Sequence, residues 1–133
     1  MKRNVYALLI LFLLLSVATT VADADENTFS KAQICRAGIS TVMGKDPNII
    51  KIDKIKDQII YLFYIRPSDK KRWAYRCKLS GNRIIWASDT GRWRDSQYDS
   101  KITYKINGEN IKIKDRFGDG SVTMKSFSLN QLK

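Results

Sequence analysis

The feature that most constrains the fold is a change in the spacing of apolar residues after Pro47. Between Lys31 and Met43, apolar and small side chains recur every three or four residues, which is the spacing of an amphipathic helix. From residue 48 onward they alternate with polar side chains, which is typical of strands that bury one face. Such a chain is expected to form one helix that packs on an antiparallel sheet.

Both ends of the expected helix carry recognisable signals. Thr28 or Ser30 can cap the N-terminus, because a hydroxyl oxygen accepts a hydrogen bond from the first free backbone N–H groups. Gly44 suits the C-terminus and Pro47 prevents continuation. Cys35 falls on the apolar stripe of this helix, so it is expected to face the sheet.

Seven segments with strand character follow the helix, and short turns separate most of them. They cover residues 48–54, 58–65, 72–79, 83–87, 101–106, 109–115 and 121–129. Because short turns make sequence neighbours pair, we predict an α+β fold with one N-terminal helix on a strongly bent antiparallel β-meander, either open or closed into a small barrel.

Two details of this meander are predicted from turn chemistry and phase. Asn107-Gly108 is the pair favoured in a type I′ hairpin turn. In the last segment Val122 and Met124 alternate out of phase with Phe127, so a bulge near residues 125–126 is expected to restore one inward face.

The first 24 residues have the pattern of an export signal. A short basic start precedes the apolar run Val5–Leu15, and Ala22-Asp23-Ala24 matches the small-x-small pattern before a cleavage point. We expect cleavage after Ala24, a single folded domain from 25 to 133 and no membrane span after cleavage. The alternative is an uncleaved anchor, since the 18 residues 5–22 are just long enough to span a thin bilayer.

The amino-acid composition excludes several classes of functional site. The chain has 24 Lys and Arg, 13 Asp and Glu and no His, with a net charge of +11. Removing residues 1–24 takes away Lys2, Arg3 and Asp23, which leaves +10. Without His, most metal sites and the triads that need an imidazole base are excluded. No phosphate-binding or dinucleotide-binding motif is present, so we expect no metal, no cofactor and no catalytic residue.

Two cysteines, Cys35 and Cys77, are expected to form a disulfide. An exported domain with two cysteines usually joins them. Cys77 shares a strand face with Trp73 and Tyr75, so both sulfurs are expected in one core. The alternative is a pair of free thiols.

Asp89-Thr90-Gly91 matches the short signature of aspartic proteases and supports an alternative function. In that class a second carboxylate shares a proton with the first, and Arg92 beside the dyad would disrupt the arrangement. We therefore interpret the motif as a turn. A small hydrolase that uses Asp residues near Asp89 remains the alternative to a binding protein.

Basic side chains lie opposite the expected core in two places. Lys101, Lys105, Lys112 and Lys114 alternate with apolar residues in the hairpin 101–115, and Arg72, Arg76 and Lys78 do so in the strand 72–79. If these strands are coplanar, one face attracts anionic partners such as acidic proteins, lipid headgroups or nucleic acid. The alternative is a solvated face that keeps the protein soluble.

The loop that contains Arg92-Trp93-Arg94 is the remaining candidate. Trp and Arg are enriched at the energetic centres of interfaces. The alternative is that Trp93 packs beneath its own loop. Together these features predict a monomeric, non-enzymatic binding module, inhibitor- or immunity-like, in the periplasm or secreted. It would recognise an anionic protein surface or envelope component. The expected binding residues are Arg92, Trp93, Arg94, Lys101, Lys105, Lys112 and Lys114.

Overall fold

The computed structural model describes residues 28–133, so the expected signal peptide and its cleavage site lie outside the described residues. The described chain forms one α-helix, seven strands and two short 3-10 helices. In order these are α1 (Lys31–Met43), η1 (Pro47–Ile49), β1 (Lys51–Lys56), β2 (Ile59–Ile65), β3 (Arg72–Ser80), β4 (Arg83–Ser88), β5 (Lys101–Asn107), β6 (Asn110–Arg116), β7 (Val122–Ser128) and η2 (Leu129–Leu132). Among the helices in this part of the chain, none is both long and apolar enough to cross a membrane.

The helix has the predicted bounds and caps. The Ser30 hydroxyl accepts a hydrogen bond from the backbone N–H of Gln33 at 3.1 Å, and the Gln33 side chain accepts one from the Ser30 N–H at 2.8 Å. This reciprocal capping box satisfies two N–H groups that the helix itself leaves free. At the other end Gly44 adopts a left-handed conformation (φ +62°), which ends the helix.

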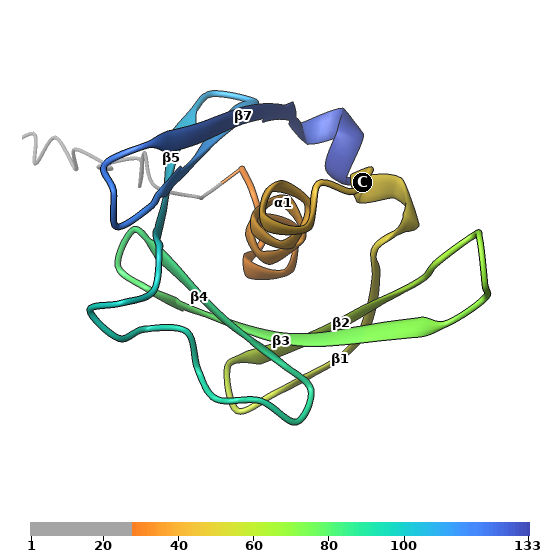
Figure 1. The fold of residues 1–133 in the computed structure, drawn as a ribbon. Coiled ribbons are helices and arrows are strands. Elements are labelled where there is room, and N and C mark those ends of the chain that lie inside the picture. The colour runs from red at the N-terminus through yellow and green to blue at the C-terminus, as the bar shows by residue number, and fades with distance from the viewer. Residues whose placement is uncertain (1–27) are drawn as a thin grey trace, which may run out of the picture.

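The strands form one antiparallel sheet in sequence order, β1 to β7, which confirms the predicted meander. β1 and β7 do not pair with each other, so the sheet is open rather than a closed barrel. It curls around α1, which lies in its concavity (Figure 1). The bend falls between β4 and β5, where only two residue pairs join the strands: Arg83 with Thr103 and Ile84 with Ile102.

The concave face of the sheet and α1 together form the core. Cys35 of α1 and Cys77 of β3 are completely buried and form the predicted disulfide. Gly38 allows the helix to approach β4, because a Cβ at this position would lie 2.9 Å from Cγ2 of Ile84. The helix is thus held to the sheet by a covalent bond and by close packing.

The β5–β6 turn differs from the predicted one by one residue. Asn107 pairs with Asn110, so the two loop residues are Gly108 and Glu109, and of these only Gly108 has a positive φ. The type I′ prediction centred on Asn107-Gly108 is therefore wrong. The observed register places Ile106 opposite Ile111, whereas the predicted turn would place Ile106 opposite Glu109. Apolar pairing on the inner face outweighs the local preference of the turn.

The bulge predicted in the last strand is also absent from β7. Its pairing with β6 is continuous, and Phe127 lies opposite Ile111 in the core. With Phe127 inward, strict alternation turns Met124 and Val122 outward, where they are 53% and 40% exposed. A register shift occurs instead in β1, between Ile52 and Lys54.

Two further expectations near the ends of strands need correction. The first strand begins later than predicted because Pro47 starts η1, which the Asp46 side chain caps by accepting a hydrogen bond from the Asn48 N–H at 2.8 Å. Trp73 was expected in the core but is 40% exposed. It lies near the tip of the β2–β3 hairpin, which extends away from α1 (Figure 1).

Candidate functional site

The outward face of β5 and β6 carries an array of basic side chains, which we call the basic face. It consists of Lys101, Lys105, Lys112, Lys114 and Arg116. Four of these five were predicted from their alternation with apolar residues. Arg116 was missed because the predicted strand ended at Asp115, although Arg116 continues the alternation of Lys112 and Lys114.

Cross-strand pairing places like charges directly opposite each other on the basic face. Lys105 lies opposite Lys112, and Lys101 lies opposite Arg116. Directly opposed side chains in an antiparallel pair lie about 4.5–5.5 Å apart at Cβ, and like charges in such positions are destabilising. The one acidic residue within the two strands, Asp115, faces the interior and is 3% exposed, so it does not lie among the cations.

The cations of the basic face are without acidic partners in the structure. Between residues 28 and 133, the ion pairs involve Arg66, Arg72, Arg92 and Arg94, and none involves the basic face. The five cations therefore share one surface with solvent as their counter-charge. Such a surface produces a positive potential that attracts anions from solution.

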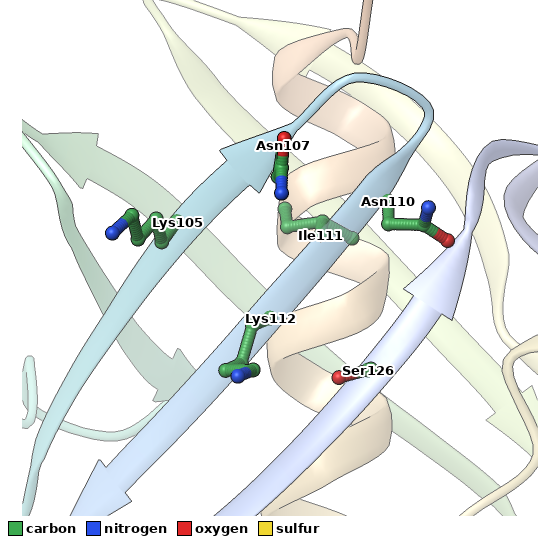
Figure 2. Close-up of a pocket in the computed structure, with 6 residues that line it drawn as sticks. All are labelled: Lys105, Asn107, Asn110, Ile111, Lys112 and Ser126. Carbon is green, nitrogen blue, oxygen red and sulfur yellow. The ribbon is translucent and has the colours of Figure 1, made fainter.

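The basic face is shallowly hollowed rather than flat. A pocket of about 230 Å³ lies on this side, and Lys105 and Lys112 are among the residues that line it. Figure 2 shows these residues on strands that lie in front of α1. Asn107, Asn110 and Ser126 add amide and hydroxyl groups to the same pocket. A second hollow of about 200 Å³ lies between Lys101 and Arg116. Each hollow therefore combines cations with neutral hydrogen-bonding groups, which suits carboxylate or phosphate oxygens.

The loop of residues 89–100 holds the other predicted residues in a fixed arrangement. Arg92 donates two hydrogen bonds to the Asp99 carboxylate, at 2.7 and 2.9 Å, and Asp99 also accepts from the Ser96 hydroxyl at 2.9 Å. Hydrogen bonds from the Arg92 guanidinium and from the hydroxyl and backbone N–H of Ser96 hold the pKa of Asp99 well below its usual range. Arg92 is thus engaged within the loop.

The Trp93 ring lies on the outward face of β3 and β4, where it contacts the cationic side chains of Arg76 and Lys78. The ring lies 4.8 Å from the Arg76 guanidinium and 4.2 Å from the Lys78 ammonium. The strand neighbours of these two residues, Ala87 and Ile85, are buried although they face away from α1. This position corresponds to the alternative in which Trp93 packs beneath its loop. Its contact with a partner stays a prediction.

The basic face and the Trp93 loop do not form one flat surface. The loop lies along β3 and β4, on the other side of the bend from β6 and β7 (Figure 1). The expected continuous field joined the basic residues of the 101–115 hairpin to Arg72, Arg76 and Lys78 of β3. It depended on coplanar strands, and the bend at β4–β5 separates these two groups.

Asp89 lines a different pocket, of about 410 Å³, at the ends of β3 and β4. Among the described residues that line it, Asp89 is the only carboxylate, so the paired carboxylates that the hydrolase alternative requires do not meet there. Residues 28–133 also hold no group of three His, Cys, Asp or Glu side chains arranged to bind a metal ion.

Comparison of the chain with models of protein families, with curated proteins and with solved structures finds no match.

Proposed function

We propose that this protein is a small, non-enzymatic binding module that recognises an anionic partner through its basic face. The observation that carries this proposal is the placement of Lys105 opposite Lys112 and Lys101 opposite Arg116, with no acidic residue between them. A partner that supplies carboxylates or phosphates would relieve this repulsion when it binds, and the relieved repulsion would add to its affinity.

The cost of the arrangement argues against a purely solubilising role. Charges that only keep a protein soluble are best interspersed in sign, because opposite charges in cross-strand positions stabilise the sheet and like charges destabilise it. The neighbouring strand adds exposed apolar groups at Met124 and Val122, beside Lys114 and Arg116. A surface with cations and apolar groups in contact suits a macromolecular partner, such as an acidic protein of the inhibitor or immunity type.

The proposed location is the periplasm or the extracellular space. The buried disulfide supports it, because such bonds form and persist in oxidising compartments. The export pattern of residues 1–24 supports it independently. Intact-mass measurement of the protein outside the cytoplasm is expected to give a chain that begins at or near Asp25; a chain that retains residues 1–24 would contradict the export signal.

A charge-reversal experiment tests the role of the basic face. In the variant Lys105→Glu/Lys112→Glu, the opposed pair remains like-charged, so the fold should be as stable as before. The matched control is Lys56→Glu/Lys71→Glu, which changes the net charge equally at two exposed positions in the β1–β3 part of the chain. Binding is measured against poly-glutamate, phosphatidylglycerol vesicles and a DNA duplex, each at low and at high salt.

We expect the native protein to bind at least one of these anions, with an affinity that falls as salt rises. The basic-face variant should lose about tenfold or more of this affinity, while the control should change it by about twofold or less. The probe that binds best identifies the class of partner. Equal losses in both variants would show that only net charge matters, and the proposal would fail. Trp93→Ala, measured against the same probe, tests the predicted contribution of the Arg92-Trp93-Arg94 loop.

A further inference from the structure

The last strand, β7, has an edge that no other strand within residues 28–133 covers. The sheet is open, so β1 and β7 each pair with a neighbour on one side only. An uncovered edge presents a row of backbone N–H and C=O groups, and another extended chain can pair with them. The two edges of this sheet differ in how well they could accept such a chain.

β1 is protected against pairing, whereas β7 is regular. β1 carries Lys51, Lys54 and Lys56, and its register shifts between Ile52 and Lys54. Lysines and irregular pairing are common devices that keep an edge from accepting a new strand. β7 contains a single lysine and pairs with β6 over its whole length without a register shift. The edge of β7 can therefore receive a further strand.

The hydrogen bonds at the two ends of β7 show which of its backbone groups point to this edge. The Phe117 N–H donates to the Ser121 carbonyl at 2.9 Å, and the Leu129 N–H donates to the Glu109 carbonyl at 2.8 Å. Every second residue of an antiparallel strand bonds to its neighbour, so the odd-numbered residues of β7 bond to β6. The residues whose N–H and C=O groups point to the free edge are Val122, Met124 and Ser126.

Within residues 28–133, the backbone groups of Val122, Met124 and Ser126 that point to the free edge have no hydrogen-bond partner. Ser128 is the next residue in this series, and its N–H already donates to the Gln131 side chain at 2.8 Å. The free edge therefore spans residues 122–126, which is long enough to pair with a short extended segment.

The free edge adjoins the hollows of the basic face. Ser126 lines the hollow of about 230 Å³ together with Lys105 and Lys112 (Figure 2). Met124 lines a further hollow of about 260 Å³, to which Lys112 and Lys114 also contribute. A strand added to β7 would lie about 4.8 Å from it and about twice that distance from β6. Every second side chain of the added strand would then point outward beside these lysines.

We propose that the edge of β7 binds an extended acidic peptide, a segment of another protein that pairs antiparallel with residues 122–126. The proposal rests on the function proposed for the basic face and specifies the form of the partner. Backbone pairing supplies affinity, and carboxylates that point toward the lysines supply selectivity. A second copy of this chain suits the edge poorly. Each chain has a net charge of +11, and pairing two β7 edges would bring two basic faces side by side.

A blocked peptide of about seven residues, in which glutamate and valine alternate, is the probe. When its glutamates face the basic side, their N–H groups bond to β7 and the valine N–H groups point away. Methylating the glutamate nitrogens removes these bonds, so affinity should fall by about tenfold or more. Methylating the valine nitrogens is the matched control and should change affinity by about threefold or less. Equal binding of the two methylated peptides would overturn the proposal.

Hydrogen exchange measured by NMR locates the bound peptide. The amide protons of Val122, Met124 and Ser126 should exchange rapidly in the free protein and slow down when the peptide binds. The amides of β1 serve as the control and should not change. Protection of β1 in place of β7 would overturn the proposal. Protection of β7 that rises with protein concentration in the absence of peptide would assign the edge to a second copy and overturn it as well.

Two variants at Met124 test the edge from the side of the protein. Met124→Pro removes an N–H that faces the edge, and edge strands accept proline where the N–H faces solvent. Met124→Ala keeps this N–H and is the matched control. Proline should weaken peptide binding by about tenfold or more, and alanine by about threefold or less. Circular dichroism checks that both variants fold, and equal weakening by both would contradict the proposal. If the proline variant does not fold, the methylated peptides decide the question on the native protein.

A change of charge separates this proposal from the function proposed for the basic face. A peptide with lysine in place of glutamate keeps every backbone group, and it should not bind; binding as tight as that of the acidic peptide would reject an acidic partner. Lys105→Glu/Lys112→Glu should weaken the acidic peptide by about tenfold. Unchanged binding of this variant would overturn the part of the proposal that rests on the basic face. Weakened binding together with equal affinity for the two methylated peptides would support the basic face and reject the edge.

Discussion

At Gly38 the helix α1 lies close to β4. A Cβ added there would lie 2.9 Å from Cγ2 and 3.0 Å from Cδ1 of Ile84, whose side chain is buried. The overpacking costs about 1–3 kcal/mol, while replacing a helix glycine by alanine returns about 1 kcal/mol. Gly38→Ala should therefore lower the free energy of unfolding by about 1 kcal/mol. Urea unfolding measures this change, and its cost should shrink in an Ile84→Val background; a more stable Gly38→Ala protein would contradict the packing argument.

Asp99 makes the order of its loop depend on pH. The hydrogen bonds from Arg92 and Ser96 lower the pKa of Asp99 below its unfolded value, which is about 3.9. The ionised carboxylate therefore stabilises the loop above that pH, and this contribution is lost as the pH falls through about 3.9 toward the folded pKa. Trp93 fluorescence should report the change.

An Asp99→Asn variant is the control for this titration. It keeps the shape of the side chain but carries no charge, so Trp93 fluorescence should lose its acid transition. A transition of equal size in both proteins would assign it to another carboxylate, such as Asp69, whose pKa is lowered to about 2 by the Arg66 side chain.

At the scale of elements, the β1–β2 hairpin has a turn whose backbone does not suit its residues. Asp57 and Gln58 form the two-residue loop, and both have positive φ, at 51° and 65°. Two consecutive positive values define a type I′ turn, which prefers Asn-Gly. Asp57→Asn/Gln58→Gly should therefore raise the free energy of unfolding by about 0.5–1 kcal/mol.

Chemical denaturation of the two proteins measures this gain. The matched control is the same type of glycine change at Glu109, in the second loop position of the β5–β6 turn, where φ is not positive. Glu109→Gly should give no gain, because the backbone there does not need glycine. A gain at Glu109 equal to that at the β1–β2 turn would contradict the argument.

Across the whole molecule, the disulfide links the N-terminal helix to the middle of the sheet. Cys35 and Cys77 are 42 positions apart, and both are completely buried. Closing a loop of this length restricts the unfolded chain and stabilises the fold by about 3–4 kcal/mol. Cys35→Ala/Cys77→Ala should lower the free energy of unfolding by about that amount. Reductant should destabilise the native protein but leave this variant unchanged, and equal stability of both would show that packing alone holds α1.

Local patterns predicted the elements of this fold. The bounds of α1 followed from Ser30 and Gly44, whose effects act within one helical turn. The strand order followed from short turns, which leave sequence neighbours as the nearest partners. Four residues of the basic face followed from the period of two. The predictions failed at the β5–β6 turn and in β7, where the local signals conflicted. At both places the pairing of buried side chains, Ile106 and Phe127 with Ile111, set the strand register.

One helix, seven strands and a positive outward face in the 101–115 hairpin follow from spacing within single segments. The Cys35–Cys77 bond was expected from the presence of two cysteines in an exported chain, and the fold shows that the two sulfurs meet. The relative placement of the surface groups depends on contacts between distant segments. The bend at β4–β5 separated the Trp93 loop from the basic face, and Trp73 of β3, Trp86 of β4 and Arg94 of the following loop line one pocket. A bent sheet was expected, but the position of the bend depends on where the β4–β5 pairing stops, after two residue pairs, and no pattern within a single strand encodes that.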